Sequence, residues 1–354
     1  MGGTGGSRAG PEAKGRPSPR GAAPRTGVTV AVVGATGAVG REMIAVLEQR
    51  RFPVGELRLL ASPRSAGRMV RALGRDHEVR PADAEALRGV DVALFSAGSD
   101  TSKRLGPVAR DLGALVIDNS SAFRMDADCP LVVPELNGDT LKGHRGIIAN
   151  PNCSAILLCM AVAPLHRAAG LRRVVACTYQ AVSGAGARAM DELERQEDAE
   201  RAGQPLEHKV FPAVIAHNVI PWVTGLMPDG YTVEETKLRD ETRRILGLKD
   251  LPLASTCVRV PVLRAHSQAV HVELSRPLSP DEALALYEKT PGVRAVREGL
   301  PTPREVAGSD EVVVGRVRLD RAFTPGLALW CVMDQLRKGA ALNAVQIAER
   351  LVRS

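Results

Sequence analysis

The sequence contains few aromatic residues, since Phe, Trp and Tyr together make up 3% of its 354 residues. Surfaces that bind single-stranded nucleic acid need aromatic side chains for base stacking, so we expect no nucleic-acid partner. The formal net charge of +7 leaves this expectation unchanged. Residues 1–26 hold five Lys or Arg and one Glu, a net +4, so the rest of the chain carries only +3.

Long hydrophobic runs are also missing. The longest apolar run, 155–163, has about half the length that a helix needs to cross a membrane. We therefore expect no transmembrane helix and no membrane partner. Residues 1–26 contain seven Gly, four Pro and no hydrophobic segment of signal-peptide type, which predicts a disordered N-terminal tail.

The six cysteines form no Cys-x-x-Cys pair and no disulfide framework; they stand at 129, 153, 159, 177, 257 and 331. This usage is typical of the reducing cytoplasm. The seven histidines include no His-Glu-x-x-His motif and no Cys/His ligand cluster, so we expect no bound metal. A composition of 44% hydrophobic and 25% charged residues indicates a globular chain, long enough for two domains.

The first recognisable unit is a strand, a glycine turn and a helix. The β-branched run Val28–Val33 predicts a buried strand, and residues 41–50 predict a helix. Between them, Gly34 would form the turn, Gly37 would let a pyrophosphate approach closely and Gly40 would pack the helix against the strand. This context predicts a dinucleotide site, in which the cofactor contacts Gly34, Thr36, Gly37, Ala38 and Val39.

The segment after the next strand indicates which dinucleotide binds. An NAD enzyme usually carries an acidic residue there for the ribose hydroxyls. After Leu57–Leu60, however, this chain continues Ala-Ser-Pro-Arg64-Ser65, without a carboxylate. Because a guanidinium pairs with a 2′-phosphate that Asp or Glu would repel, Arg64 and Ser65 predict NADP. The alternative is an ordinary arginine in a surface loop.

The rest of the N-terminal half alternates strands with helices. A helix is expected at 101–111, and further parallel strands at 92–95, 115–117 and 147–148. This alternation predicts an α/β domain with a doubly wound parallel sheet. The turns at 96–98 and 118–121 follow strands, at the sheet edge where such folds bind ligands.

The pattern changes after residue 153. Longer strands that look antiparallel are expected at 173–180, 257–262, 268–274 and 311–319, with polar helices between them at 188–200, 233–246 and 281–289. We predict a second, α+β domain, whose large sheet offers a surface for a homodimer. The segment 327–352 combines an apolar stretch with an amphipathic run and predicts a closing helix.

One stretch carries the strongest chemical signal. Residues 148–154 read Ile-Ala-Asn-Pro-Asn-Cys-Ser and precede an apolar run of helical character. The Asn-Pro turn places Cys153 at a helix N-terminus, where free N–H groups and the helix dipole favour a thiolate. We therefore expect a lowered pKa for this thiol, and N–H groups available to a developing oxyanion. The alternative is a buried cysteine that acts only as a small hydrophobe.

Seven motifs follow one another along residues 28–352. They are Gly34–Gly40, Asn119–Arg124, Asn150–Cys153, Gln180–Gly186, Glu234–Lys237, Arg259–His266 and Arg337–Ala341. Together they resemble the aspartate-semialdehyde dehydrogenases. The resemblance implies a Rossmann-like N-terminal domain and an α+β catalytic and dimerisation domain, in a glyceraldehyde-phosphate-dehydrogenase-like arrangement. We expect a tail (1–26), a dinucleotide-binding domain (27–152, completed by a C-terminal helix at 327–354) and a catalytic domain (153–326).

The resemblance also implies catalytic and substrate-binding roles. Cys153 would attack an acyl phosphate to form an acyl-thioester, and His266 would exchange the proton that accompanies hydride transfer. Arg259 would bind the substrate α-carboxylate, Glu234 its ammonium group, and Gln180 would orient it. For His266 the alternative is a structural histidine held in the core.

Phosphate and cofactor contacts are implied in the same way. The phosphate site would consist of Arg124, Asn152 and Lys237, and the nicotinamide end of the cofactor would contact Ser183, Gly184 and Gln335. Two cations close to a dianionic leaving group suit its displacement. For Glu234 and Lys237, which are three residues apart, the alternative is an ordinary surface ion pair.

The implied enzyme is an oxidoreductase, a phosphorylating aldehyde dehydrogenase. It would reduce L-aspartyl 4-phosphate with NADPH to L-aspartate 4-semialdehyde, on the route to diaminopimelate, lysine, methionine and threonine. One alternative is an N-acetyl-glutamyl-phosphate reductase, which shares the thioester chemistry but has no use for Glu234, because its substrate lacks a free ammonium. Another is a non-catalytic nucleotide sensor, which would be expected to lose Cys153 or His266.

Overall fold

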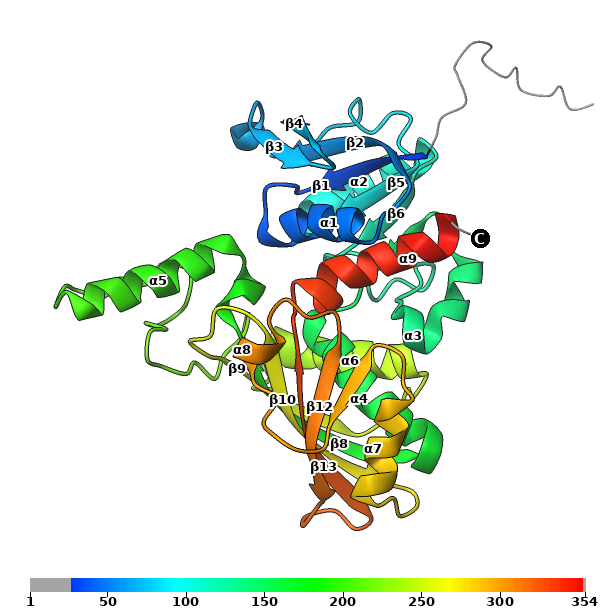
Figure 1. Ribbon diagram of the computed structural model, residues 1–354, viewed down its shortest axis with the longest axis vertical. Coiled ribbons are helices and arrows are strands. Elements are labelled where there is room, and N and C mark those ends of the chain that lie inside the picture. Colours follow the sequence, from blue (N-terminus) through cyan, green and yellow to red (C-terminus); the bar gives the residue numbers. More distant parts are fainter. Residues whose placement is uncertain (1–26, 353–354) are drawn as a thin grey trace, which may run out of the picture.

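The computed structural model describes residues 27–352, which form two sheets with helices around them (Figure 1). The predicted N-terminal tail lies outside the described residues, and so do the last two residues of the predicted C-terminal segment. Within residues 27–352, no helix is long and apolar enough to cross a membrane.

The first sheet has seven strands in the order β3-β4-β2-β1-β5-β6-β7. Its strands are β1 (Val28–Val33), β2 (Val54–Ala61), β3 (Met69–Ala72), β4 (Arg75–Pro81), β5 (Val92–Phe95), β6 (Leu115–Asp118) and β7 (Ile147–Ala149). All neighbours are parallel except β3 and β4, which form an antiparallel pair at one edge. The predicted strands are confirmed, while the β3-β4 pair was not expected, because its polar residues show little alternation.

Helices cover both faces of this sheet, as the predicted doubly wound arrangement requires. On one face, α1 (Ala38–Gln49) and α9 (Leu342–Val352) bury their apolar sides against β1, β2 and β5. On the other face lies α2 (Ser99–Asp111). Short turns complete this part of the chain: η1 (Pro63–Ser65), α3 (Pro134–Asn137) and η2 (Gly138–Gly143).

The second sheet has six strands in the order β11-β12-β13-β10-β8-β9. Its strands are β8 (Leu171–Gln180), β9 (Leu253–Arg259), β10 (His266–Leu274), β11 (Val293–Val296), β12 (Val312–Leu319) and β13 (Gly326–Met333). Of the four strands predicted here, β8 and β10 pair antiparallel as expected, whereas β8 and β9 are parallel. The predicted β12 is antiparallel to β13 and parallel to β11, and neither β11 nor β13 was predicted as a strand. β13 is also antiparallel to β10. The strand expected at 257–262 lies earlier, because Pro261 cannot donate to a ladder and ends it.

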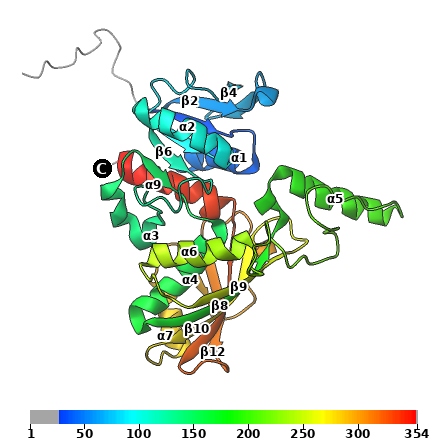
Figure 2. The ribbon, with the colours of Figure 1, turned by 180° about the vertical axis from the view of Figure 1, so that it is seen from behind.

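One face of the second sheet packs on the long helix α4 (Cys153–Ala169) and on α7 (Pro280–Glu288). Behind α4 lies α6 (Val233–Leu246), which starts with a capping box between Thr232 and Glu235. The remaining helical elements are η3 (Val182–Ala185), α5 (Ala187–Arg201) and α8 (Pro303–Val306). Two opposite views show that α5 projects away from the body of the molecule (Figures 1 and 2).

The prediction of a closing helix from residue 327 is wrong for the first part of that segment. Residues 326–333 form β13, which pairs with both β10 and β12 in the second sheet. A π-helical turn at Arg337–Ala341 follows, and the helix α9 starts only at Leu342. A short apolar run such as 329–332 suits a buried strand as well as a buried helix, so local sequence could not decide between them. The chain does return to the first sheet, where α9 packs.

Candidate active site

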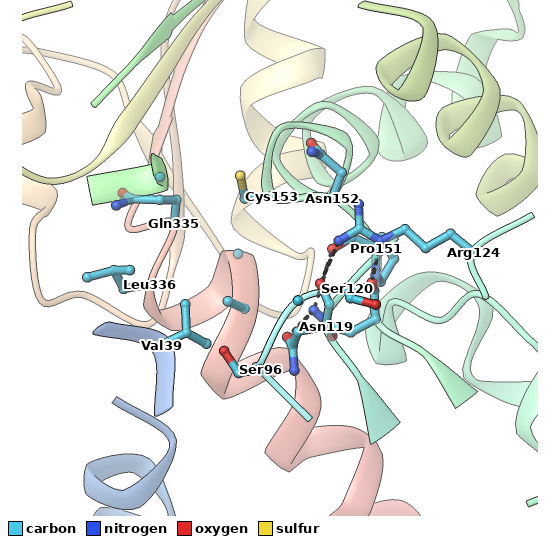
Figure 3. A pocket seen from close by; sticks show the side chains of 15 residues that line it. Val39, Ser96, Asn119, Ser120, Arg124, Pro151, Asn152, Cys153, Gln335 and Leu336 are labelled. Atoms are coloured by element: carbon cyan, nitrogen blue, oxygen red, sulfur yellow. Dashed lines mark hydrogen bonds between the residues drawn. The ribbon is translucent and has the colours of Figure 1, made fainter. Parts of the chain in front are cut away.

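A cavity lies where the two sheets meet, with Cys153 in its wall (Figure 3). Six of the predicted site residues line it: Val39, Arg124, Asn152, Cys153, Gly184 and Gln335. Other lining residues come from the turns predicted at strand ends, namely Ser96, Gly98, Asn119 and Ser120. Asn150, Pro151, Gly339 and Ala340, which also line the wall, belong to two of the seven motifs but were given no role from the sequence. Leu336, which completes the wall, was not singled out.

Cys153 is the first residue of α4, as predicted. Asn152 caps the helix, because its side-chain oxygen accepts hydrogen bonds from the backbone N–H groups of Ser154 (2.8 Å) and Ala155 (3.3 Å). On the opposite side, the π-helical turn brings Gly339 against the nucleophile. A Cβ atom at Gly339 would lie 2.9 Å from Cβ of Cys153 and 2.8 Å from Cε of Met333, so only glycine fits there.

The predicted lowering of the Cys153 pKa is wrong for the free protein. Burial of the sulfur, with a contribution from the Glu234 carboxylate, raises the pKa of the thiol to about 11. Arg124, Arg259 and the Ser154 N–H act in the opposite direction without reversing the shift. The expected lowering rested on the helix N-terminus, whose effect on the pKa is smaller than that of burying the sulfur.

The raised pKa of the Cys153 thiol predicts how its alkylation rate depends on pH. The rate of carboxamidomethylation of Cys153 should rise about tenfold per pH unit from about pH 7 to about pH 10, because the thiolate fraction grows tenfold per unit below the pKa. Glu234→Gln should raise the rate several-fold at fixed pH by removing a carboxylate that opposes ionisation. The measurement is mass spectrometry of the peptide that contains residue 153. A rate that levels off near neutral pH would contradict the raised pKa.

His266 begins β10 and is 1% exposed. Its Nδ1 accepts a hydrogen bond from the backbone N–H of Ala181 at 3.0 Å, so the neutral ring carries its proton on Nε2. That Nε2 has no hydrogen-bond partner within residues 27–352. Burial and the nearby Arg259 hold the pKa of His266 well below its usual value. The ring therefore presents a neutral N–H donor toward Gly184, whose Cβ position lies 3.0 Å from Nε2.

Arg259 ends β9 and is 7% exposed. One Nη1 donates to the Ala181 carbonyl at 2.7 Å, and the guanidinium lies 5.8 Å from the ring centre of Phe211. It forms no ion pair with any residue that the structure describes, although a buried cation normally has an anionic partner. This side chain therefore has N–H donors ready for a carboxylate.

The fold explains why these groups meet. Gln180 and Arg259 are register partners at the ends of the parallel strands β8 and β9, and His266 begins the antiparallel β10 at the same sheet edge. Ala181, directly after β8, contacts both His266 and Arg259 through its backbone. Three predicted residues from distant parts of the sequence are thus brought together.

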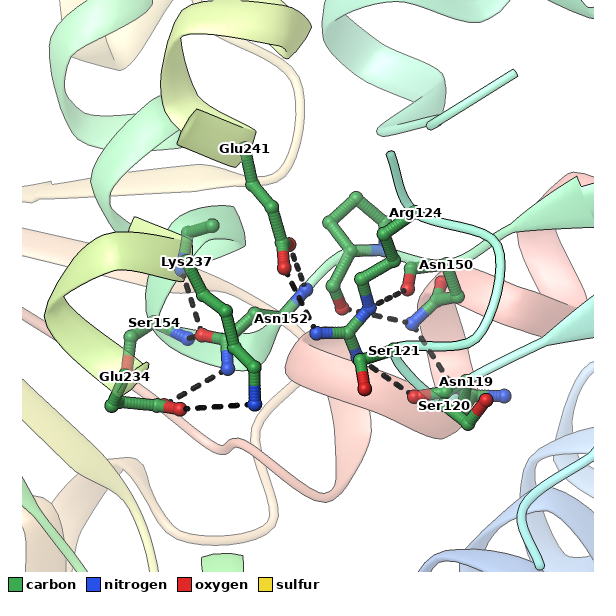
Figure 4. A network of polar contacts seen from close by, with 12 residues as sticks. Asn119, Ser120, Ser121, Arg124, Asn150, Asn152, Ser154, Glu234, Lys237 and Glu241 are labelled. Atoms are coloured by element: carbon green, nitrogen blue, oxygen red, sulfur yellow. Dashed lines mark hydrogen bonds and ion pairs between the residues drawn. The ribbon is translucent and has the colours of Figure 1, made fainter. Parts of the chain in front are cut away.

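Gln180 and Glu234 form a buried polar group with Asn152 and Ser154, the two neighbours of Cys153. Figure 4 shows Glu234, Asn152 and Ser154. The Gln180 amide donates to Ser154 Oγ at 2.6 Å and to Glu234 Oε1 at 3.1 Å, and Asn152 Nδ2 donates to the same Oε1 at 2.9 Å. Lys237 Nζ lies 4.0 Å from the other oxygen of Glu234. Because Glu234 is buried, this pair is not the ordinary surface ion pair that spacing alone allows.

Arg124 is held on three sides. Its guanidinium donates to the carbonyls of Asn150 (3.0 Å) and Asn119 (2.7 Å), and to Glu241 Oε1 (3.1 Å). Glu241 was missed by sequence reasoning. Its spacing from Glu234 and Lys237, seven and four residues along the same helix, was the available signal, because such residues share one helix face.

At the dinucleotide turn, close backbone contacts explain the glycines. Gly34 has a positive φ of 96°, and a Cβ there would lie 2.3 Å from the Ser96 carbonyl oxygen. A Cβ at Gly40 would lie 2.2 Å from the Gly34 carbonyl oxygen. Exposed Gly37 caps α1, directly before Ala38.

The other predicted cofactor contacts fall into two groups. Near the turn, Thr36 Oγ1 donates to Ser65 Oγ at 3.4 Å, and Arg64 is exposed beside them in η1. At the cavity, Gln335 Nε2 donates to Ser183 Oγ, and Gln335 Oε1 accepts from the Ala265 N–H at 2.9 Å. Only Val39, Gly184 and Gln335 of the predicted cofactor contacts line the cavity itself. Among residues 27–352, no group of three or more potential metal-binding side chains lies together.

The fold and this site define a two-domain, dinucleotide-binding protein of the semialdehyde dehydrogenase class. Residues 29–144 match the family described as semialdehyde dehydrogenase, NAD binding domain. Residues 162–338 match semialdehyde dehydrogenase, dimerisation domain. Together these matches cover most of the chain.

Individual relatives narrow the class. Aspartate-semialdehyde dehydrogenase of Aquifex aeolicus is 48% identical over 92% of this chain and 98% of its own length, and that of Bacillus subtilis is 45% identical over 92% and 97%. The crystal structure of aspartate semialdehyde dehydrogenase II from Vibrio cholerae superposes with a TM-score of 0.90, at 45% identity over 93% of this chain and 99% of that one. The chain belongs to the aspartate-semialdehyde dehydrogenase family.

Proposed function

We propose that this chain reduces L-aspartyl 4-phosphate with NADPH to L-aspartate 4-semialdehyde and phosphate, in the biosynthesis of lysine, methionine and threonine. The observation that carries the proposal is Arg259, a buried guanidinium without an ion-pair partner in the described chain, next to the neutral N–H of His266. A substrate with a free α-carboxylate supplies the missing anion. A Vibrio cholerae relative has been crystallised in complex with ASA.

Each step assigns work to a residue of this chain. The Cys153 thiol gives up its proton to the departing phosphate as its sulfur bonds to the acyl carbon and the carbon–oxygen bond to phosphate breaks, which gives a thioester and hydrogen phosphate. Arg124, Lys237 and Asn152 hold the leaving phosphate. NADPH, when bound, supplies hydride to the thioester carbonyl. His266 Nε2–H donates to the oxygen as it becomes negative, and the sulfur then leaves as the aldehyde forms.

The substrate is oriented by its two charged ends. Arg259 binds the α-carboxylate, Glu234 accepts from the α-ammonium group, and the unpartnered Oε1 of Gln180 offers a further acceptor. Glu234 is buried and faces this site, which favours an aspartyl substrate over an acetylated glutamyl one. An acetylated amine would leave that carboxylate without a cationic partner.

The cofactor proposal rests on the first turn of the chain. Gly34, Thr36, Gly37, Ala38 and Val39 would hold the pyrophosphate, since Gly34 and Gly40 keep the turn free of side chains that would fill it. Exposed Arg64, with Ser65 beside Thr36, would hold a 2′-phosphate. Ser183, Gly184 and Gln335 would contact the nicotinamide end. We therefore propose NADP rather than NAD as the preferred cofactor.

We also propose the assembly and setting of the enzyme. Residues 27–152 would form the dinucleotide-binding domain. The catalytic domain, expected at 153–326, would extend to Met333, since β13 belongs to the second sheet, and the returning segment would begin after it. The second domain pairs two copies into a homodimer, in keeping with the description of its family match. All six cysteines are free thiols, which suits the reducing cytoplasm.

The test is an assay in the oxidative direction, which follows formation of reduced cofactor from aspartate semialdehyde with and without inorganic phosphate. We expect turnover only with phosphate, and faster turnover with NADP than with NAD. N-acetylglutamate semialdehyde, run in parallel, should give none. Turnover of that substrate alone would contradict the proposed roles of Glu234 and Arg259, while the absence of turnover with both would contradict catalysis by this chain.

A further inference from the structure

Two ion pairs converge on Asn152, the residue that precedes the nucleophile (Figure 4). Its side-chain amide donates to Glu234, which lies 4.0 Å from Lys237. Its backbone N–H donates to Glu241 Oε2 at 2.6 Å, while the other oxygen of Glu241 accepts from Arg124 at 3.1 Å. Each cation of the proposed phosphate site therefore already has a buried carboxylate beside it.

Glu241 is the member of this network that sequence reasoning did not find. It is 1% exposed, and burial raises the pKa of its carboxyl, while Arg124 and the Asn152 N–H act in the opposite direction. Both of its oxygens accept N–H donors, so these contacts suit the carboxylate. Arg124 is also anchored by two backbone carbonyls, of Asn119 and Asn150. The position of the Arg124 guanidinium therefore does not depend on Glu241 alone. The net charge of the Arg124–Glu241 pair, in contrast, does depend on Glu241.

We infer that Glu241 is a positioning residue that sets the charge of the phosphate site: it balances Arg124, so that phosphate is bound weakly enough to leave, and it holds the Asn152 backbone that orients Cys153. This inference rests on the proposed function. A cation already paired with a buried carboxylate attracts an arriving dianion less than an unpaired one does. The same contact to the Asn152 N–H restrains the turn that leads into α4.

The two proposed roles of Glu241 predict different kinetic changes in Glu241→Gln. Loss of the charge should lower the KM for phosphate, and loss of the support for Asn152 should lower kcat. The glutamine carbonyl can still accept from Asn152, and the backbone carbonyls still hold Arg124, but the negative charge is gone. The apparent KM for inorganic phosphate should fall about tenfold, because the site becomes more positive. At the same time kcat should fall several-fold, because the Gln NH2 group then faces the Arg124 N–H donor, and this repulsion disturbs the contact to the Asn152 N–H that orients Cys153. If Glu241 had a purely structural role, the substitution would lower kcat or stability without lowering the KM for phosphate.

Glu235→Gln is the matched control. Glu235 is a buried carboxylate on the same helix whose oxygens accept from the Thr232 N–H (2.6 Å) and the Cys257 N–H (2.8 Å), with no contact to Arg124 or Asn152 among the described residues. It should lower the melting temperature and leave the KM for phosphate unchanged. Glu241→Asp, which keeps the charge, should restore the wild-type KM for phosphate.

The experiment measures KM for inorganic phosphate in the oxidative assay, and also the phosphate concentration that half-protects Cys153 from alkylation, which needs no turnover. Tighter phosphate binding by Glu241→Gln in both measurements supports the inference. Unchanged or weaker phosphate binding by a folded Glu241→Gln protein overturns it. If wild-type protein shows no phosphate-dependent turnover, the proposed function fails separately, and the protection assay still decides the role of Glu241.

Discussion

Replacing Cys153 with alanine is expected to lower phosphate-dependent turnover by about 10⁴-fold or more, because no other group can form the acyl intermediate. Cys153 is the first residue of α4 and the only cysteine among the described residues that line the cavity. NADPH binding should persist, since the proposed pyrophosphate contacts lie at Gly34 to Val39. Steady-state turnover and NADPH fluorescence titration measure the two quantities.

Two further cysteine variants sharpen this test. Cys153→Ser keeps the size of the side chain but should stay inactive, because an alkoxide is a poorer leaving group than a thiolate. Cys159→Ala alters a cysteine on the same helix that is wholly buried in the core, and it should cost stability while keeping turnover. Phosphate-dependent turnover by Cys153→Ala would contradict the thioester mechanism.

Arg259→Leu is expected to lower kcat/KM for aspartate semialdehyde by about 10³-fold, the range for losing one partner of a buried, hydrogen-bonded charge pair. In the free protein this guanidinium donates a hydrogen bond to the Ala181 carbonyl and lies over the Phe211 ring, but it forms no ion pair within the described chain, so the substrate carboxylate would supply its ionic partner. Arg259→Lys should recover little of the loss, because an ammonium cannot reproduce the planar, two-pronged contact.

A surface arginine gives the comparison. Arg297, which pairs with Glu288 and Asp281 in solvent, should tolerate leucine with little change in kinetics. Cofactor titration of Arg259→Leu should match wild type. An Arg259→Leu protein with near-normal kcat/KM would show that the substrate carboxylate binds elsewhere.

Much of the fold was accessible from local patterns. The run Val28–Val33, the glycine turn and the polar helix Val233–Leu246 were predicted with the bounds that the structure shows, or close to them. Such elements are determined by side-chain period, glycine placement and capping residues within a few positions. The segment 327–352 was misjudged because its apolar start fits both a strand and a helix, and only its two strand neighbours select the strand.

The candidate site divides in the same way. The Asn-Pro turn and the apolar run that follows were enough to place Cys153 at a helix N-terminus. The pKa of that thiol could not be predicted in the same way. Burial and Glu234, 81 positions away, raise the pKa by more than the helix N-terminus lowers it. Glu241 was missed because its partners Arg124 and Asn152 lie 117 and 89 positions away.

The sequence by itself thus determined the dinucleotide turn, the position of the nucleophile at a helix start and the residue types needed for thioester chemistry. Only the tertiary structure decided that His266 and Arg259 share the backbone of Ala181, that Gly339 closes on Cys153 and that buried carboxylates balance the phosphate site. The physical reason is range. Turns, caps and periods act over a few residues, whereas burial and charge depend on segments that meet only after the chain has folded.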